Sequence, residues 1–183
     1  MAAGKILPYL DIPFQHASQK ILKLMKRPAN SENVLGRIKK WREICPQLVI
    51  RSTFIVGFPG ETEADFEQTL HVVREARFAA AFTFQYSKRP GTPAAEMPDQ
   101  IPQSVVTERY NRLLETVNEV TWAENRTLVG REVEVLISVG EGKKDAETAR
   151  ISGRAPDNRL VHVALDSSLP VPRPGDMVIA EIT

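Results

Sequence analysis

Apolar residues recur along the first half of the chain with two periods, one of two residues and one close to 3.6. Short apolar runs with the shorter period predict strands at residues 9–14, 49–56 and 79–86. The stretches between them repeat apolar residues at helical spacing. They predict helices over 19–26, from 31 to just before Pro46, and over 63–77. Strands and helices that alternate at this spacing predict parallel β-α units, and three strands are too few for a closed barrel.

The pattern changes twice in the second half. Residues 88–103 are rich in Pro and Gly and predict an irregular connection, and residues 104–125 return to helical spacing. From Arg131 onward apolar and polar residues alternate, which predicts an all-β module. Its expected strands begin near residue 133 and continue at 149–153, 160–165 and 177–182. The sequence therefore predicts three parts, namely a β-α domain at 1–103, a linking helix at 104–130 and a β domain at 131–183.

Composition narrows the class of protein. The chain has 183 residues, 42% of them hydrophobic and 26% charged, with a formal net charge of +1. These values are typical of a globular protein and give no bulk electrostatic reason to bind nucleic acid or membrane. No apolar run is long enough to span a bilayer, and the first residues lack a signal-peptide core. We expect a cytoplasmic monomer with no membrane partner.

The stretch from Val49 to Thr62 is where the sequence first points to a ligand. An apolar strand runs into Gly57, Pro59 and Gly60, and an amphipathic helix follows. Glycine lets a loop pass close to a ligand, and ligands of α/β folds bind at the carboxyl ends of the strands. An ordinary β-α turn with two glycines fits the same spacing, so both interpretations stay open at this point.

Three strings, taken together, resemble the methylthiotransferases, a branch of the radical S-adenosylmethionine (SAM) enzymes. They are Tyr9-Leu-Asp-Ile-Pro-Phe-Gln-His-Ala-Ser18, Ile55-Val-Gly-Phe-Pro-Gly-Glu-Thr62 and Ser87-Lys-Arg-Pro-Gly-Thr-Pro-Ala94. The resemblance runs from about Pro8 to the last residue. It implies an α/β fold that forms the C-terminal part of a partial (β/α) barrel, here strands four to six of six. It also implies that the module after Arg131 is a TRAM-like small antiparallel barrel, which at Thr183 would lack its closing strand.

The resemblance also implies cofactors, namely SAM and [4Fe–4S] clusters. In that family one cluster is held by a Cys-x3-Cys-x2-Cys triplet and a second by three further cysteines. This chain has one cysteine, Cys45, which we expect to be a small buried hydrophobic residue. We therefore expect a fragment that contains no cluster ligand and is inactive alone. The implied reaction is radical: a reduced cluster cleaves SAM, and a sulfur and a methyl group are installed on the substrate.

Five residues are candidates for the SAM pocket. A polar pair, Gln15 and His16, ends the first strand, and by resemblance Gln15 belongs to the pocket wall. The two-residue period places Arg51 and Thr53 on one strand face and Ser52 on the other. Arg51 is suited to pair with the methionine carboxylate of SAM. By resemblance Ile55 and Gly57 approach the adenine. For Glu61 we favour a structural role as a carboxylate at a helix N-terminus.

Basic residues supply the candidates for a nucleic-acid surface. Lys88 and Arg89 follow the third strand, and Arg150, Arg154 and Arg159 gather in the β module. Solvated surface charge explains the first pair equally well. Residues 131–183 contain seven Lys and Arg against nine Asp and Glu, which argues against a strongly basic module.

The substrate branch is ambiguous in the sequence. Up to about Glu75 the chain resembles the branch that modifies an aspartate of ribosomal protein S12. From about Ala76, including Ser152-Gly-Arg154, it resembles the branch that modifies N6-isopentenyladenosine at position 37 of tRNA. We favour tRNA as the partner, with ribosomal protein S12 as the alternative. A non-enzymatic RNA- or ribosome-binding module remains a third hypothesis.

Overall fold

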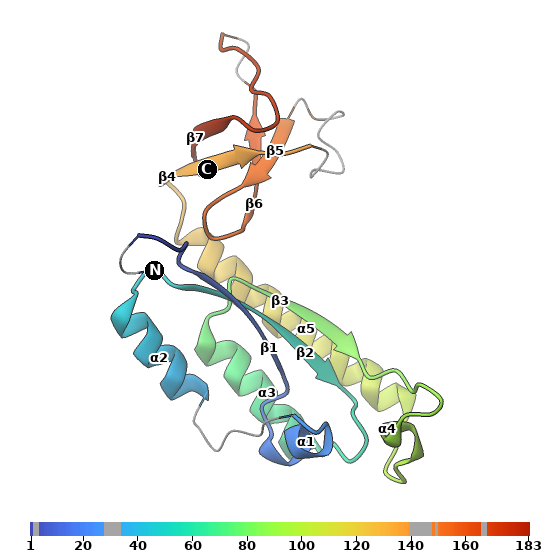
Figure 1. Cartoon of the computed structure of the whole chain (residues 1–183). Helices are drawn as coiled ribbons and strands as arrows, with labels where there is room; N and C mark the ends of the chain where they lie inside the picture. The colour runs from blue at the N-terminus through green and yellow to red at the C-terminus, as the bar shows by residue number, and fades with distance from the viewer. Residues whose placement is uncertain (2–3, 28–33, 140–147, 149, 166–167) are drawn as a thin grey trace. The chain divides into compact units, whose positions relative to one another are not determined.

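The computed structural model describes residue 1 and residues 4–27, 34–139, 148, 150–165 and 168–183 (Figure 1). It divides into two compact units. Leu10–Glu124 form the first, which we call the β/α unit. Met1–Tyr9 together with Asn125–Thr183 form the second, which we call the β module. None of the described helices is long and apolar enough to cross a membrane. The boundaries predicted from the sequence at 103 and 130 stay a prediction.

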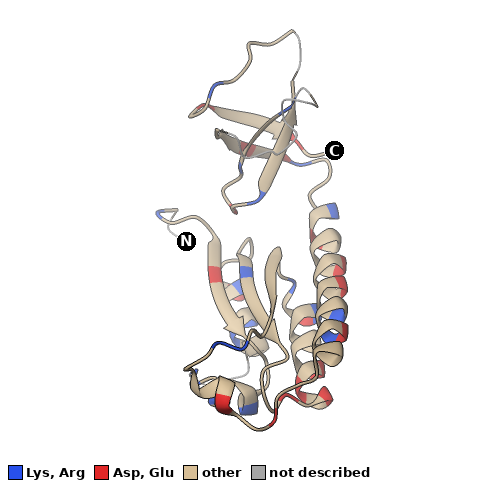
Figure 2. Cartoon of the chain, turned by 90° about the vertical axis from the view of Figure 1, so that its right-hand side faces the viewer, with Lys and Arg blue, Asp and Glu red and all other residues tan. Residues whose placement is uncertain are grey.

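The β/α unit contains three strands in the order β1-β2-β3, with β2 and β3 parallel, as predicted. The elements that lie wholly or mostly in this unit are β1 (Tyr9–Gln15), α1 (Gln19–Leu24), α2 (Val34–Ile44), β2 (Val49–Val56), α3 (Glu63–Ala76), β3 (Ala80–Gln85), α4 (Pro93–Glu96) and α5 (Gln103–Arg126). The predicted start of the second helix at 31–33 lies outside the described residues. Figure 2 shows basic and acidic residues along α5, as expected for a helix with one solvated face.

The ends of helices α1 and α3 have local causes. Thr62 caps α3, since its hydroxyl accepts a hydrogen bond from the Asp65 amide while the Asp65 carboxylate accepts one from the Thr62 amide. The helix ends at Ala76, one residue earlier than predicted, because Arg77 is left-handed with φ 52°. Helix α1 likewise ends at Leu24 rather than at Lys26, which has φ 53°.

Strand β2 has one buried and one open face. Ile50, Ser52, Phe54 and Val56 are buried, whereas the residues between them are half-buried. The alternation that the sequence predicted for this strand is confirmed. Across the β2–β3 register, Thr53 and Ile55 stand beside Phe82 and Phe84, which are 51% and 53% exposed. The sheet therefore keeps an open face that carries aromatic and polar side chains.

The β module is an antiparallel sheet in the order β6-β5-β4-β7, consistent with a TRAM-like domain. Its strands are β4 (Glu132–Ile137), β5 (Arg150–Arg154), β6 (Leu160–Ala164) and β7 (Met177–Glu181). Residue 149, predicted to start a strand, lies outside the described residues. Val135 and Ile137 are buried. A Cβ at Gly153 would stand 2.3 Å from the Leu136 carbonyl oxygen, so the close β4–β5 pairing needs glycine there. The missing closing strand stays a prediction.

Candidate functional site

The loops that follow β1 and β2 meet at one end of the sheet. Gln15, the last residue of β1, is 8% exposed and takes a left-handed φ of 68°, which costs energy in any residue except glycine. Gly57, the first residue after β2, has φ +77°. A Cβ at Gly57 would stand 2.6 Å from Cγ2 of Val106 on α5. Two strings that are distant in sequence thus lie together, since His16 and Glu61 are within hydrogen-bond distance although 45 residues separate them.

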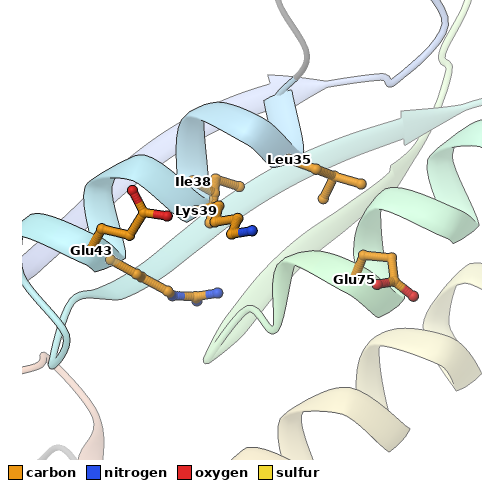
Figure 3. A pocket seen from close by; sticks show the side chains of 6 residues that line it. Leu35, Ile38, Lys39, Glu43 and Glu75 are labelled. Atoms are coloured by element: carbon orange, nitrogen blue, oxygen red, sulfur yellow. The ribbon is translucent and has the colours of Figure 1, made fainter.

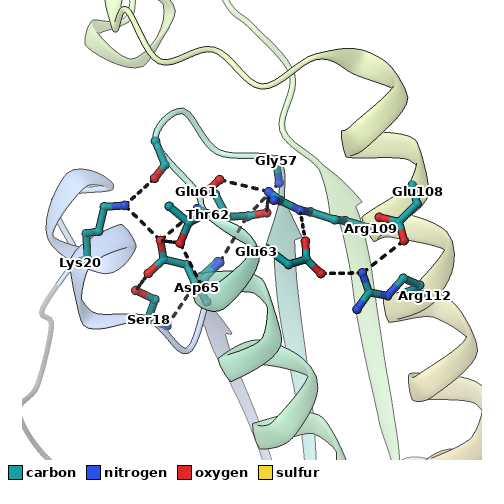
Figure 4. A network of polar contacts seen from close by, with 12 residues as sticks. Ser18, Lys20, Gly57, Glu61, Thr62, Glu63, Asp65, Glu108, Arg109 and Arg112 are labelled. Carbon is teal, nitrogen blue, oxygen red and sulfur yellow. Dashed lines mark hydrogen bonds and ion pairs between the residues drawn. The ribbon is translucent and has the colours of Figure 1, made fainter.

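Glu61 joins these loops through a buried polar network (Figure 4). Its Oε2 accepts hydrogen bonds from the Gly57 amide at 2.9 Å and from His16 Nε2 at 3.2 Å. Its Oε1 accepts one from Arg109 Nη1 at 2.8 Å. The side chain of Glu61 has no exposed surface, and that of Arg109 is 7% exposed. A buried carboxylate needs such partners, because an unpaired buried charge is costly.

The protonation of His16 follows from its second contact. The Ser18 amide donates to His16 Nδ1 at 2.9 Å, so this nitrogen accepts and Nε2 carries the proton. The imidazole therefore donates from Nε2 to Glu61. The sequence favoured a structural role for Glu61 as a carboxylate at a helix N-terminus, and Glu61 does stand directly before Thr62, the N-cap of α3. The sequence did not predict that Glu61 and His16 are both buried and paired with each other.

A second polar group lies where α1 and α3 begin. Asp65 accepts hydrogen bonds from the Ser18 hydroxyl at 2.6 Å and from Lys20 Nζ at 3.0 Å, besides its capping bonds with Thr62. Burial by itself would raise the pKa of Asp65. The hydrogen bonds from Ser18, Thr62 and Lys20 outweigh burial, and the pKa lies well below its usual range. Asp65 is therefore a structural carboxylate that ties α1 to α3.

Arg51 lies on the open face of the sheet, where the sequence placed it together with Thr53. It already has a carboxylate partner, Asp11, to which its Nε donates at 2.9 Å. Its guanidinium also lies 5.0 Å from the centroid of the Phe82 ring. Thr53 and Ile55 are half-buried on the same face. Asp11 was missed as part of this face, although its polar side chain interrupts an otherwise apolar strand.

Arg109 was also missed. It stands three residues after Val106 and four before Leu113, inside the apolar stripe of α5. A charged residue in such a stripe is a sequence signal for a buried partner. The partner itself is 48 residues away in sequence and is found only in the fold.

The residues of this chain fit SAM and do not fit an iron–sulfur cluster. For SAM, they offer the strained Gln15, the open strand face and the hydroxyl of Tyr86. That hydroxyl is buried and has no hydrogen-bond partner among the described residues. For a cluster, Cys45 is buried and is the chain's one cysteine. Within the described ranges no three His, Cys, Asp or Glu side chains are grouped to hold a metal ion.

The predicted RNA contacts differ in their availability. Lys88 and Arg89 are exposed in the segment after β3, and Arg150 is exposed at the start of β5. Arg154 is half-buried and donates to the Asn158 carbonyl at 3.1 Å. Arg159 is half-buried and bonds Asp157. Arg150 and Arg154 stand at the two ends of β5, and the two-residue period of a strand places them on one face of the sheet.

A separate pocket of about 470 Å³ lies between α2 and α3 (Figure 3). Its lining consists of Leu35, Ile38, Lys39, Arg42, Glu43 and Glu75. Arg42 donates to the carbonyl oxygens of Ala76 at 2.7 Å and Arg77 at 3.0 Å, and so closes the end of α3. Burial, together with the charge of Arg77, lowers the pKa of Arg42. The Arg42 side chain in this pocket is thus committed to holding a helix end.

A family model and similar curated proteins relate this chain to the same group of proteins. Residues 1–73 match the model of the radical SAM superfamily. The tRNA-2-methylthio-N(6)-dimethylallyladenosine synthase of Salinispora arenicola (strain CNS-205) is 59% identical over 174 residues, 95% of this chain and 35% of that protein. Proteins of the same name from Nocardioides sp. (strain ATCC BAA-499 / JS614) and Mycolicibacterium smegmatis (strain ATCC 700084 / mc(2)155) are 54% and 55% identical. They cover 97% and 100% of this chain, and 36% and 35% of their own length.

The chain spans 35–36% of the length of these curated relatives. Their alignments cover the parts before and after Ala76 alike, so the prediction of a chain mixed between two substrate branches is not supported. Residues 1–73 are thus similar to the radical SAM superfamily, and nearly the whole chain is homologous to part of the proteins named tRNA-2-methylthio-N(6)-dimethylallyladenosine synthase.

Proposed function

We propose that this chain is part of a radical SAM methylthiotransferase that adds a methylthio group to N6-isopentenyladenosine at position 37 of tRNA. The observation that carries the proposal is the meeting of Gln15–Ser18 with Gly57–Thr62 beside an open strand face. These loops are the strings in which the chain resembles that family. The relatives of the chain are named for this tRNA product.

In this proposal the β/α unit holds SAM. Gln15, Gly57 and Ile55 form the wall beside the adenosine, and Thr53 supplies a hydroxyl on the open face. Arg51 binds the methionine carboxylate in a charge-assisted pair and exchanges Asp11 for it. SAM supplies the adenosyl group and the methyl group of the reaction. The protein residues bind SAM, orient it and exclude water.

Arg51→Ala tests this assignment in the intact gene product. We expect SAM affinity to fall by about 1–3 kcal/mol, because a hydrogen-bonded charge is removed. Arg74→Ala is the matched control, since Arg74 is exposed on α3. Isothermal titration with SAM measures both variants. A folded Arg51→Ala protein with unchanged SAM affinity would make Arg51 a structural residue.

The proposal also assigns tRNA binding to basic residues. Arg150 is ready to contact phosphate, whereas Arg154 and Arg159 must first leave their contacts with Asn158 and Asp157. Lys88 and Arg89 extend the basic set in the β/α unit.

Replacing Arg150, Arg154 and Arg159 by Ala tests the module. We expect weaker tRNA binding and a salt dependence flatter by about one released counterion for each lost phosphate contact. The charge-matched control replaces Lys23, Lys39 and Arg74, which are exposed on α1, α2 and α3. Equal losses in the two triple variants would remove the module arginines from the interface. Unaltered tRNA binding with a loss of binding to ribosomal protein S12 would favour the other substrate.

A further inference from the structure

We infer that Glu61 is the positioning residue that fixes the Gly57–Gly60 loop for SAM, and that it does so by connecting the loop to α5 and to the end of β1. The ligand in this inference rests on the proposed function. The positioning role rests on the contacts of Glu61, which the sequence did not assign.

The carboxylate of Glu61 turns back onto its own loop. Oε2 accepts from the Gly57 amide, and the Glu61 amide donates to the Phe58 carbonyl at 3.0 Å. Both the carboxylate and the backbone amide of Glu61 thus bond to residues at the start of the same loop. Gly57 has a left-handed φ and faces Val106 closely, so its amide cannot turn elsewhere without moving α5 or the loop.

Arg109 holds Glu61 from α5. Its Nη1 bonds both the carboxylate of Glu61 at 2.8 Å and the Glu61 carbonyl at 3.1 Å. His16 holds the same carboxylate from the β1 end. Three segments that are distant in sequence thus converge on two oxygen atoms. In a site this buried, such hydrogen bonds are strong and the loss of one leaves a donor unpaired.

The rest of the loop is held by contacts that do not involve Glu61. The Gly60 amide donates to the Asp99 carbonyl at 2.8 Å, and Lys20 Nζ donates to the Gly60 carbonyl at 2.7 Å. A change at Glu61 should therefore release the Gly57 end of the loop while the Gly60 end stays in place. This difference separates a positioning role from general unfolding.

Glu61→Gln is the decisive variant. Three N–H groups, from Gly57, His16 and Arg109, donate to the Glu61 carboxylate. A glutamine presents one oxygen and one NH₂ group to them. Whichever way the amide is turned, at least one of the three N–H groups then faces the NH₂ group and loses its acceptor. Glu63→Gln is the matched control. Glu63 also pairs with Arg109, at 3.1 Å, but its side chain is 54% exposed and its other ion pair among the described residues is with Arg112 on α5. If Glu61→Gln does not fold, Glu61→Asp takes its place, because it keeps the charge and is too short to reach all three donors.

Two measurements decide the inference. Amide hydrogen exchange of the 183-residue chain should show faster exchange at Gly57 in Glu61→Gln, with Gly60 and α3 unchanged. SAM titration of the intact gene product should show affinity reduced about tenfold, with near-normal affinity in Glu63→Gln. Unchanged exchange at Gly57 in a folded variant would overturn the inference, as would unchanged SAM affinity. An unmutated gene product that does not bind SAM would overturn the proposed function, and exchange at Gly57 alone would then decide the positioning role.

Discussion

The Gly57 loop and the Asp157–Asn158 turn both use arginine to hold a loop, but they do so over different distances in sequence. Arg109 reaches Glu61 from 48 residues away, and both side chains are almost fully buried. Arg159 reaches Asp157 from two residues away, and both keep 18–20% of their side-chain surface exposed. Arg154 bonds a carbonyl four residues away.

This difference separates arginine contacts on which the tertiary fold depends from contacts that hold only a local turn. In the buried network, removing one partner leaves a charge with no access to water. In the turn, a released arginine can move into solvent or toward a phosphate group. The first arrangement suits a loop that must stay fixed, and the second suits residues that we propose to exchange partners on binding tRNA.

Arg109→Ala should have the largest effect on stability. We expect the free energy of unfolding to fall by about 3–5 kcal/mol, because Glu61 would remain buried and lose its cation. Arg112→Ala is the control, since Arg112 is 36% exposed and pairs with exposed Glu63 and Glu108. It should cost at most about 1 kcal/mol. Urea unfolding followed by circular dichroism measures both. Equal losses would contradict the distinction between buried and exposed pairs.

Gly57→Ala should have the next largest effect. A left-handed alanine costs about 1–2 kcal/mol, and crowding against Val106 adds about 1–3 kcal/mol. Gly60 has a similar φ of +81°, and a Cβ there would stand 3.4 Å from Cδ1 of Leu24, an ordinary contact distance. Gly60→Ala should therefore show only the cost of the left-handed backbone. Combining Gly57→Ala with Val106→Ala should relieve the crowding. Thermal unfolding of the three variants tests this, and identical losses for the two glycines would exclude crowding as a cause.

The sequence predicted what depends on local pattern. Alternation along β2 placed Arg51 and Thr53 on one face, and apolar residues at helical spacing predicted the helix over 63–77. It did not predict the burial of Glu61 or its pairing with Arg109, because that contact depends on how α5 packs against the loop. Asp11 was missed for the same reason, since its partner lies on the neighbouring strand.

The pH dependence of the Asp65 cap should be smaller and has a defined sign. Because the pKa of Asp65 is lowered in the folded state, its contribution to stability is complete above the ordinary aspartate value of 3.8. The contribution is lost as the pH falls from there toward the folded pKa. At neutral pH, Asp65→Asn should cost about 1–2 kcal/mol. Urea unfolding between pH 7 and pH 2.5 should show the two proteins converge as the pH falls, and a constant difference would contradict this account.

Asp157→Ala should have the smallest effect, because Arg159 can turn toward solvent once its partner is gone. We expect a loss of about 1 kcal/mol or less in the stability of the β module, since the pair is local and partly exposed. The Nε of Arg159 is buried and lacks a hydrogen-bond partner among the described residues. Because an unpaired buried donor is costly, the Arg159 side chain has a reason to move even in the unmutated protein. The same variant should bind tRNA at least as well as the unmutated protein, because it removes a competitor for the Arg159 guanidinium. A stability loss as large as that of Arg109→Ala would mean that the turn is as rigid as the Gly57 loop, and Arg159 would then be unavailable for phosphate.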